Sequence, residues 1–296
     1  MTMQFDVAFI TVNYNTCTLV EELLSFFKTT SLPFSYRFVV VDNNSTDGSR
    51  ELLEHENWEP LLYLQTNENL GYGRGMNRGL AAVDCRYACI MNTDLILNRE
   101  ALTALWHFFE ESPAAGVAAP VILGADHRTQ GFIFTPGILS LYSQLYAKVR
   151  IKQSKLRVLR AVTPLQVPGV MGAFFMFRRS SFTDCLFDED FFFYYEDTEL
   201  AHRFWHAGIR CYVLPQVSIV HLGGQSTSAE GGRLFQVSRK LYILKTYGKF
   251  HASLLGVLDR LRLYGKFLKY YLLRLIIPTE KIRSKYDFYA RIIQDG

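Results

Sequence analysis

The sequence predicts an α/β fold, in which a mixed, mainly parallel sheet is flanked by helices and followed by a C-terminal helical extension. In the first 120 residues, four short apolar runs of strand length alternate with helical segments, which is the pattern of βαβ units. The runs are apolar almost throughout, as expected for strands covered by helices on both faces. Polar residues directly follow three of the four runs.

The individual elements follow from the same periodicities. Strands are expected at residues 7–12, 38–41, 61–64 and 87–91, and later at 172–177, 211–214 and 218–221. Helices are expected at residues 18–29, 47–54, 75–83, 99–110 and 198–207. Ser45 or Thr46 is expected to cap the second helix, because a hydroxyl can accept a hydrogen bond from a free amide of the first turn.

The chain is expected to form a first domain over residues 1–232, with halves at 1–123 and 124–232, and a helical extension over 233–296. Residues 124–165 look less regular than their surroundings. The basic stretch 148–160 within them indicates either a mobile loop over the site or a solvated loop.

Composition excludes several classes of protein. With 49% apolar and 20% charged residues among 296, the chain is globular and not disordered. The five cysteines are odd in number and scattered, so a reducing compartment is expected. No signal peptide is expected at the start, and no apolar run approaches the 18 residues or so of a membrane span.

The net charge of +4 hides an asymmetry. Residues 233–296 contain 14 Lys or Arg against 4 Asp or Glu, whereas residues 1–232 contain 18 against 24. Within 251–275, leucines and tyrosines fall in one helical sector and Arg262, Lys266 and Lys269 fall outside it. A basic amphipathic helix of this kind can lie on an anionic membrane. It can equally pack on the first domain with its charges in water.

The polar residues that follow the strands are the first candidates for a site. In open α/β sheets, ligands bind outside the carboxyl ends of the strands. The candidates at these three ends are Asn13, Asp42, Asn44, Asn92, Thr93 and Asp94.

Five segments give the sequence a specific resemblance. In order, they are VVVDNNSTDGS, NENLGYGRGMNRGL, MNTD, MGAFFMFRR and FFFYYEDTELAHRFWHAG. Together they resemble family 2 glycosyltransferases of GT-A fold over about residues 5–245, and most of all the rhamnosyltransferase-like members that build bacterial surface polysaccharides. The resemblance implies transfer of a sugar from a nucleotide diphosphate sugar to an acceptor hydroxyl, with inversion and usually with a divalent metal. Residues 1–123 would bind the nucleotide sugar and 124–232 the acceptor.

The resemblance also implies a metal site. Asn92, Thr93 and Asp94 occupy the place of the family's Asp-any-Asp motif, with Asn as the first residue. Asp94 is the implied ligand and His221 a further one. Oxygen ligands together with phosphate suit Mg²⁺ or Mn²⁺. The alternatives are that Asp94 caps a helix and that His221 is structural.

The implied donor contacts are Asn13, Asp42, Asn44, Asn92 and Thr93, together with Arg74 and Asn77. The last two lie in a glycine-rich turn before a helix, where backbone can approach a phosphate closely. This turn is neither a dinucleotide fingerprint nor a P-loop.

The implied general base is Asp197, beside Glu196. Two adjacent carboxylates at a partly buried position can raise one pKa. Alternatively, both acids simply favour the start of a helix. Glu199 stands where the family more often has Asp.

dTDP-rhamnose is the leading donor by resemblance, and a UDP-sugar is the rival donor. The acceptor would be lipid-linked or a polysaccharide, and the location the cytoplasmic face of a bacterial membrane. A rival from another class is an inactive nucleotide- or carbohydrate-binding protein. No nucleic-acid-binding motif is present.

Overall fold

The computed structural model describes residues 5–130, 142, 144–182, 185–223, 229–277 and 279–295. The chain divides into two compact units, Met1–Leu241 and Tyr242–Gly296. The first unit therefore ends nine residues beyond the predicted boundary at 232. It includes the start of the long helix α8, where the Ser238 hydroxyl donates to the carbonyl oxygen of Phe193 at 2.7 Å.

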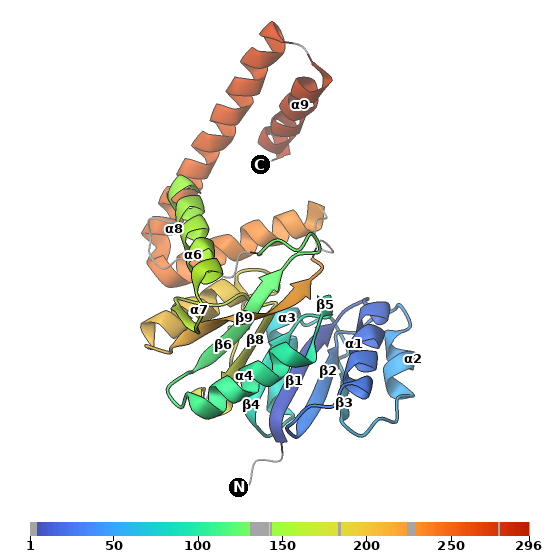
Figure 1. The fold of residues 1–296 in the computed structure, drawn as a ribbon. Coiled ribbons are helices and arrows are strands. Elements are labelled where there is room, and N and C mark those ends of the chain that lie inside the picture. Colours follow the sequence, from blue (N-terminus) through green and yellow to red (C-terminus); the bar gives the residue numbers. More distant parts are fainter. Residues whose placement is uncertain are drawn as a thin grey trace. The chain divides into compact units, whose positions relative to one another are not determined.

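The described strands of the first unit form one mixed sheet (Figure 1). Along the chain they are β1 (Phe5–Asn13), β2 (Tyr36–Asp42), β3 (Leu61–Gln65), β4 (Cys85–Met91), β5 (Leu95–Ile96), β6 (Val117–Leu123), β7 (Leu165–Val167), β8 (Phe174–Arg178) and β9 (Cys211–His221). Their order in the sheet is β3-β2-β1-β4-β8-β6-β9-β5, and β7 pairs with β9.

The direction of the strands brings several chain ends to one edge of the sheet. Strands β3, β2, β1 and β4 are parallel, so β1, β2 and β4 end on the same side. Strand β8 runs antiparallel to β4 and therefore starts there, while β9, parallel to β6, ends there. The predicted mixed, mainly parallel sheet is confirmed, although 211–214 and 218–221 form one strand with an irregular register and not two strands.

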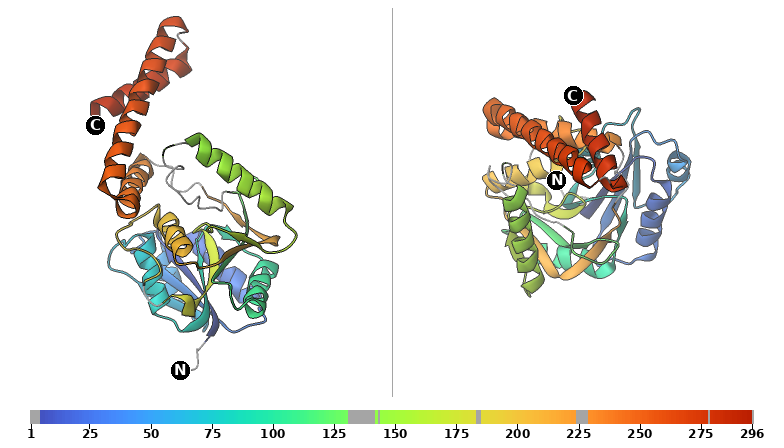
Figure 2. Two further views of the ribbon diagram at one scale, coloured as in Figure 1. Left: turned by 90° about the vertical axis from the view of Figure 1, so that its left-hand side faces the viewer. Right: turned by 90° about the horizontal axis from the view of Figure 1, so that it is seen from above.

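Helices cover both faces of this sheet, as Figures 1 and 2 show. Alternate side chains of β1 point to opposite faces, so Val7 and Phe9 join one core and Ala8 and Ile10 the other. The first core contains α1 (Cys17–Thr29), α2 (Ser49–Glu54) and α4 (Arg99–Glu111). The second contains α3 (Tyr72–Ala81), α6 (Gln144–Arg160) and α7 (Glu196–His206). A short 3-10 turn, η1 (Arg179–Ser181), follows β8.

Two predictions about local structure are wrong. The basic stretch 148–160, expected to be a loop, lies in α6, which buries Val158 against the sheet core. Residues 131–141 and 143 of the same predicted insertion lie outside the described residues. Neither Ser45 nor Thr46 caps α2: the cap position is Gly48, and the Ser45 hydroxyl donates to Asp42 instead.

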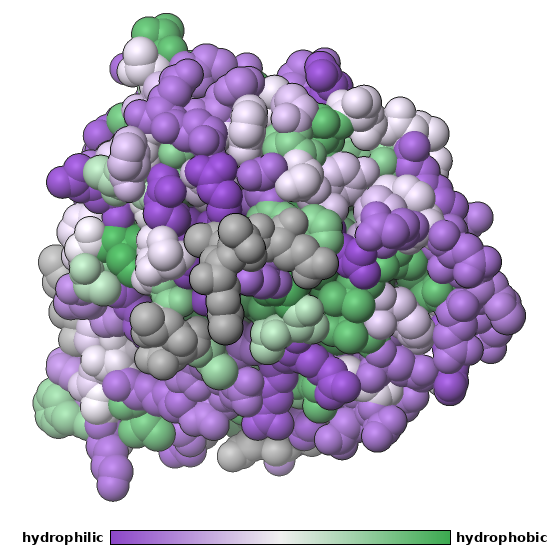
Figure 3. Space-filling model, turned by 90° about the horizontal axis from the view of Figure 1, so that it is seen from below, coloured by the Kyte–Doolittle hydropathy of each residue, from purple (hydrophilic) through white to green (hydrophobic). Residues whose placement is uncertain are grey.

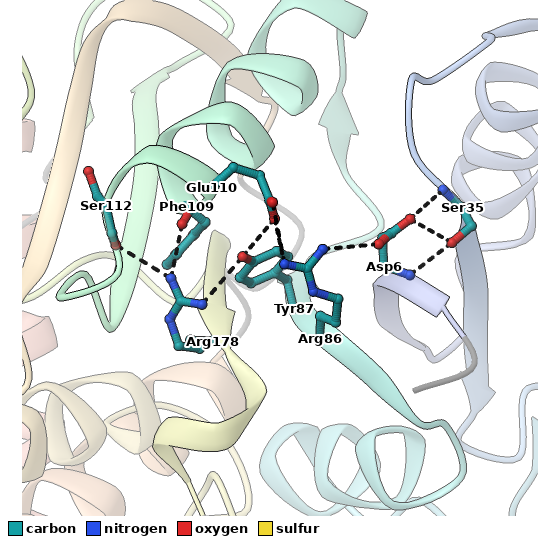
Figure 4. Close-up of polar contacts among 8 residues, drawn as sticks. All are labelled: Asp6, Ser35, Arg86, Tyr87, Phe109, Glu110, Ser112 and Arg178. Atoms are coloured by element: carbon teal, nitrogen blue, oxygen red, sulfur yellow. Dashed lines mark hydrogen bonds and ion pairs between the residues drawn. The ribbon is translucent and has the colours of Figure 1, made fainter. Parts of the chain in front are cut away.

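The opposite edge of the sheet is braced by a polar network (Figure 4). The Arg178 guanidinium lies 5.2 Å from the ring centre of Tyr87 and 5.7 Å from that of Phe109. It donates to the Phe109 carbonyl oxygen at 3.0 Å, and the Tyr87 hydroxyl donates to Glu110 at 2.8 Å. Arg86 pairs with Glu110 and with Asp6. Seen from below, the rim of the molecule is largely hydrophilic (Figure 3). The residues of the polar network in Figure 4 bond to one another and so have structural roles.

The second unit contains most of α8 (Ala229–Ile276) and α9 (Glu280–Asp295). Helix α8 is interrupted at Gly248, whose φ of 84° is not helical. Aromatic rings join α9 to the second half of α8: Tyr270 stacks on Tyr289 at 5.6 Å, and the Arg274 guanidinium lies 4.2 Å from the ring centre of Tyr286. None of the helices in the described residues is long and apolar enough to cross a membrane.

Candidate active site

A carboxylate and an imidazole face one another at the edge where β4 and β9 end. Asp94 lies in the turn after β4, and the adjoining Leu95 pairs with His221, the last residue of β9. Asp94 Oδ1 is 3.2 Å from His221 Nε2, and the amide of Gly223 donates to Asp94 Oδ2 at 3.0 Å. The side chains of Asp94 and His221 retain 13% and 16% of their accessible surface, so the pair is largely buried but still reached by solvent.

The ring of His221 is oriented by a residue that the sequence analysis did not single out. Gln130 Nε2 donates to the His221 carbonyl oxygen at 2.9 Å, which turns Gln130 Oε1 toward Nδ1 at 2.7 Å. Because that oxygen only accepts, Nδ1 carries the proton. Nε2 is then the nitrogen that points at Asp94, and Asn92 Nδ2 lies 3.3 Å from it.

The pKa of Asp94 reflects this arrangement. Burial by itself would raise the pKa of the carboxyl. The hydrogen bond and charge of His221, followed by the Gly223 amide, outweigh burial and hold the pKa of Asp94 below its usual range. The carboxyl of Asp94 is therefore ionised at neutral pH.

These atoms fit a divalent cation that also binds phosphate. An Nε2 lone pair and a carboxylate oxygen at 3.2 Å repel one another unless positive charge lies on or beside them. A proton on the ring or a metal ion supplies that charge. In the described part of the chain, no group of three His, Cys, Asp or Glu residues could hold a metal. If Asp94 and His221 held such an ion, the other coordination positions would be open to diphosphate oxygens and water, as is usual for Mg²⁺.

The second pair of carboxylates stands at the start of α7. Gly172, just before β8, donates its amide to Asp197 Oδ2 at 3.2 Å, and the Thr198 hydroxyl donates to Oδ1 at 3.2 Å. A Cβ on residue 172 would lie 2.8 Å from the Cβ of Asp197, so only glycine allows this approach. Asp197 thus accepts two hydrogen bonds in a fixed orientation.

Glu196 differs from its neighbour. Its side chain is buried, and its Oε2 has no hydrogen-bond partner within the described structure. Burial, with a smaller contribution from the charge of Asp197, raises the pKa of Glu196 to about 8. At neutral pH Glu196 therefore keeps its proton.

The two pairs belong to one site, and Tyr72 connects them. The Tyr72 hydroxyl donates to the carbonyl oxygen of Gly172 at 2.9 Å. Burial first, and then the charges of Glu196, Asp197 and Asp94, raise the pKa of Tyr72 well above its usual range. On the other side, the Asn92 amide donates to Ala173, the residue next to Gly172. Tyr72 is a further residue that the sequence analysis did not assign.

Two residues expected to contact the donor lie against the segment that leads into α7. Asn77 Nδ2 donates to the Phe187 carbonyl oxygen at 2.8 Å, and its Oδ1 accepts from the Phe187 amide at 2.9 Å. The Arg74 Nε donates to the carbonyl oxygen of Glu189 at 2.9 Å. The amide of Tyr72 donates to Phe192, closing a continuous contact between the start of α3 and residues 187–192.

The remaining donor candidates form a line across the ends of β2, β1 and β4. Asn13 pairs in register with Asp42, and its Nδ2 donates to Asp42 Oδ1 at 2.6 Å. Thr16 joins Asn13 to Thr93 through its hydroxyl. Asn13, Asp42 and Thr93 are buried, whereas Asn44 is exposed in a left-handed conformation with φ of 63°.

Solved structures share this architecture. The TarS structure of S. aureus superposes with a TM-score of 0.56 at 18% identity, covering 81% of this chain and 39% of that one. The mannosyltransferase PcManGT from Pyrobaculum calidifontis, in complex with GDP-Man and Mn²⁺, gives a TM-score of 0.54 at 16% identity, covering 99% and 86%. At these identities the likeness shows the fold alone. The fold of this chain is the GT-A fold of these enzymes.

The sequence assigns the family. The model of "Glycosyl transferase family 2" matches residues 8–186, more than half of the chain. The chain belongs to this family, as its motifs predicted. It is also 25% identical over 214 residues to an N-acetylglucosaminyl-diphospho-decaprenol L-rhamnosyltransferase of Mycobacterium tuberculosis, covering 65% of this chain and 68% of the relative.

Proposed function

We propose that this glycosyltransferase moves a sugar, best matched by rhamnose from dTDP-rhamnose, to a hydroxyl of a lipid-linked or polysaccharide acceptor in bacterial cell-surface glycan synthesis. One observation carries the proposal. A carboxylate fixed by the Gly172 amide stands at the same sheet edge as the Asp94–His221 pair. Support for the donor and a lipid-linked acceptor comes from the rhamnosyltransferase relative. A UDP-sugar is the rival donor.

The proposed step is a single displacement with inversion. The acceptor hydroxyl oxygen attacks the anomeric carbon, the bond from that carbon to the diphosphate oxygen breaks, and Asp197 takes the hydroxyl proton. The nucleoside diphosphate leaves with the electron pair. Asp197 suits this role because two hydrogen bonds fix it and its neighbour Glu196 already holds a proton.

Asp94 and His221 would hold Mg²⁺ or Mn²⁺ when the donor is bound, with Gln130 keeping Nε2 directed at the site. A divalent ion there neutralises negative charge on the leaving diphosphate. The Mn²⁺ in the PcManGT complex is consistent with this assignment.

The donor pocket is proposed at the ends of β1, β2 and β4. Asn44 is exposed and can contact the nucleoside directly, and Asn92 and Thr93 adjoin Asp94. Asn13 and Asp42 are buried and bonded to each other, so we assign them to shaping the pocket wall. For Arg74 and Asn77, a donor contact has to coexist with their bonds to residues 187–189.

The second unit is proposed to bind the inner face of the cytoplasmic membrane through residues 251–275. Its exposed apolar residues, which include Leu254, Leu261, Tyr264 and Leu268, follow one sector of α8. Rings of α9 pack beside this sector against Phe267 and Tyr270, and Tyr286 of α9 meets the edge of the sector at Tyr271. The leucines of the sector lie outside these ring contacts. A lipid-linked acceptor would then be reached at the surface that the enzyme binds.

A radiolabelled transfer assay tests the function. The full chain is incubated with polyprenyl-diphosphate-linked N-acetylglucosamine and, separately, dTDP-rhamnose or a panel of UDP-sugars, with Mn²⁺, Mg²⁺ or chelator. The expected result is transfer from dTDP-rhamnose that Asp197→Asn slows by about 10²- to 10⁴-fold. Transfer from UDP-sugars alone would show that the donor is a UDP-sugar and not dTDP-rhamnose. Donor binding without transfer under every condition would indicate an inactive binding protein.

A further inference from the structure

Helix α6 of the first unit carries charge of a single sign. Its six Lys and Arg residues are accompanied by no acid, and no Asp or Glu occurs anywhere between residues 127 and 183. The surrounding unit is acidic on balance, so the positive charge of α6 is local. The cations of α6 are Lys148, Arg150, Lys152, Lys155, Arg157 and Arg160.

The same helix exposes large apolar side chains to water. Val149, Leu156 and Leu159 are 45%, 39% and 60% exposed, and Val162, just beyond the helix, is 82% exposed. At about 100° per residue, the three in the helix fall within a sector of roughly 80°. The inward side is occupied by Val158, which is fully buried.

Cations surround this apolar sector. By the same helical arithmetic, Lys148 lies at one margin of the sector and Arg160 at the other, while Lys152 lies within the sector between Leu156 and Leu159. Lys152, Arg157 and Arg160 are all exposed. Lys155 instead points inward and donates to the Thr129 carbonyl oxygen at 2.9 Å, next to Gln130. Helix α6 is thus fastened beside the residue that orients His221, and Figure 2 shows it at the periphery of the unit.

We propose that α6, with the segment to Val162, is a membrane-binding surface of the first unit, seated on anionic phospholipid headgroups. An apolar ridge bordered by cations matches the interfacial region of such a membrane, where headgroups are negative and the acyl boundary is apolar. A soluble polyanion would satisfy the cations but leave the leucines in water. The proposal is independent of the sugar chemistry and of the surface on residues 251–275.

Vesicle co-sedimentation of the full chain tests it, with phosphatidylglycerol-containing vesicles compared with pure phosphatidylcholine. The triple variant Lys152→Glu, Arg157→Glu, Arg160→Glu should partition about 100-fold less onto anionic vesicles, since each cation contributes about a tenfold effect or somewhat less. A matched control reverses three exposed arginines on other elements, Arg78, Arg99 and Arg128, and should bind like the parent.

The contribution of the second unit is separated by repeating the comparison in a background with Arg262, Lys266 and Lys269 changed to Glu. The α6 triple variant should lose binding in both backgrounds. The double variant Leu156→Ser, Leu159→Ser should weaken vesicle binding even at high salt. This double variant still tests the proposal if the triple charge variant fails to fold. Three results would each overturn the proposal. The first is equal partition of the α6 triple variant and the control triple variant onto anionic vesicles. The others are unchanged binding of the double serine variant at both low and high salt, and a parent chain that binds anionic and phosphatidylcholine vesicles equally.

Discussion

Gln130 holds His221 at two points, through the main-chain oxygen at 2.9 Å and through ring Nδ1 at 2.7 Å. One amide side chain therefore sets both the position and the tautomer of the imidazole, 91 residues away in the chain. In many metal sites, residues that hydrogen-bond to the metal ligands orient those ligands in the same way.

Gln130→Ala should lower the affinity for Mn²⁺ in the presence of nucleoside diphosphate by about 10- to 100-fold, because the ring of His221 is no longer fixed. Electron paramagnetic resonance of free Mn²⁺ measures this directly. Gln166→Ala, at an exposed position of β7, is the control and should change nothing. Unchanged affinity in Gln130→Ala would remove Gln130 from the site.

Asp94→Ala should abolish metal-dependent binding of the donor, and His221→Ala should weaken it less, since a neutral ligand attracts a divalent cation less than a carboxylate does. Titration calorimetry of the nucleoside diphosphate, with Mn²⁺ and with chelator, gives both values. Identical affinities in metal and in chelator for the parent would indicate a metal-independent enzyme.

Asp197→Asn keeps the side-chain volume but cannot take the proton. Loss of a general base costs about 10²- to 10⁴-fold in rate. Steady-state kinetics should therefore show this fall in kcat, while calorimetric donor affinity stays at the parent value. A variant that transfers sugar at the parent rate would disprove the assignment of the base.

Glu196 makes stability depend on pH. Its pKa is about 8 in the folded chain against 4.5 for the free side chain, so between these values only the folded state holds the proton. Stability from this group is complete below about 4.5 and is lost as pH rises to about 8. Glu196→Gln should flatten the pH dependence of the unfolding free energy by on the order of 1 kcal/mol per pH unit in this window. Urea unfolding at several pH values measures it, with exposed Glu21→Gln as the control.

Changing Arg262, Lys266 and Lys269 to Glu should lower the partition of the chain onto anionic vesicles by about 100-fold, because the attraction of these cations to the lipid headgroups is lost. Flotation at low and high salt reports it. Because Arg262 pairs with Asp259 at 3.0 Å, circular dichroism must show that α8 persists. If the reversed variant floats as well as the parent, residues 251–275 serve packing and not membrane binding.

The sheet could be predicted because each strand is encoded by a short contiguous segment of sequence. Residues 7–12 and 38–41, for example, are apolar runs bounded by polar residues. Candidate site residues could be selected from the sequence where a motif is contiguous, as at Asp94 and Glu196–Asp197. Gln130 gave no signal, since its contact with His221 spans 91 residues and glutamine is common on surfaces. Helix α6 was missed because, among its residues 148–160, whose burial the structure describes, Val158 alone is buried, and cations interrupt the usual apolar spacing.

The bonds between the start of α3 and residues 187–192 make the glycine-rich turn and the segment before Asp197 a single body. The Tyr72 amide meets Phe192, and residue 71 could not hold a side chain, because its Cβ would come within 2.3 Å of the Phe192 carbonyl oxygen. A ligand that shifts this turn would also shift residues 187–192, which precede Asp197 in the chain. Binding of the two substrates is then thermodynamically coupled, and each changes the affinity for the other by the same factor. In binding measurements this coupling would appear as an affinity for the acceptor that changes when the donor site is filled.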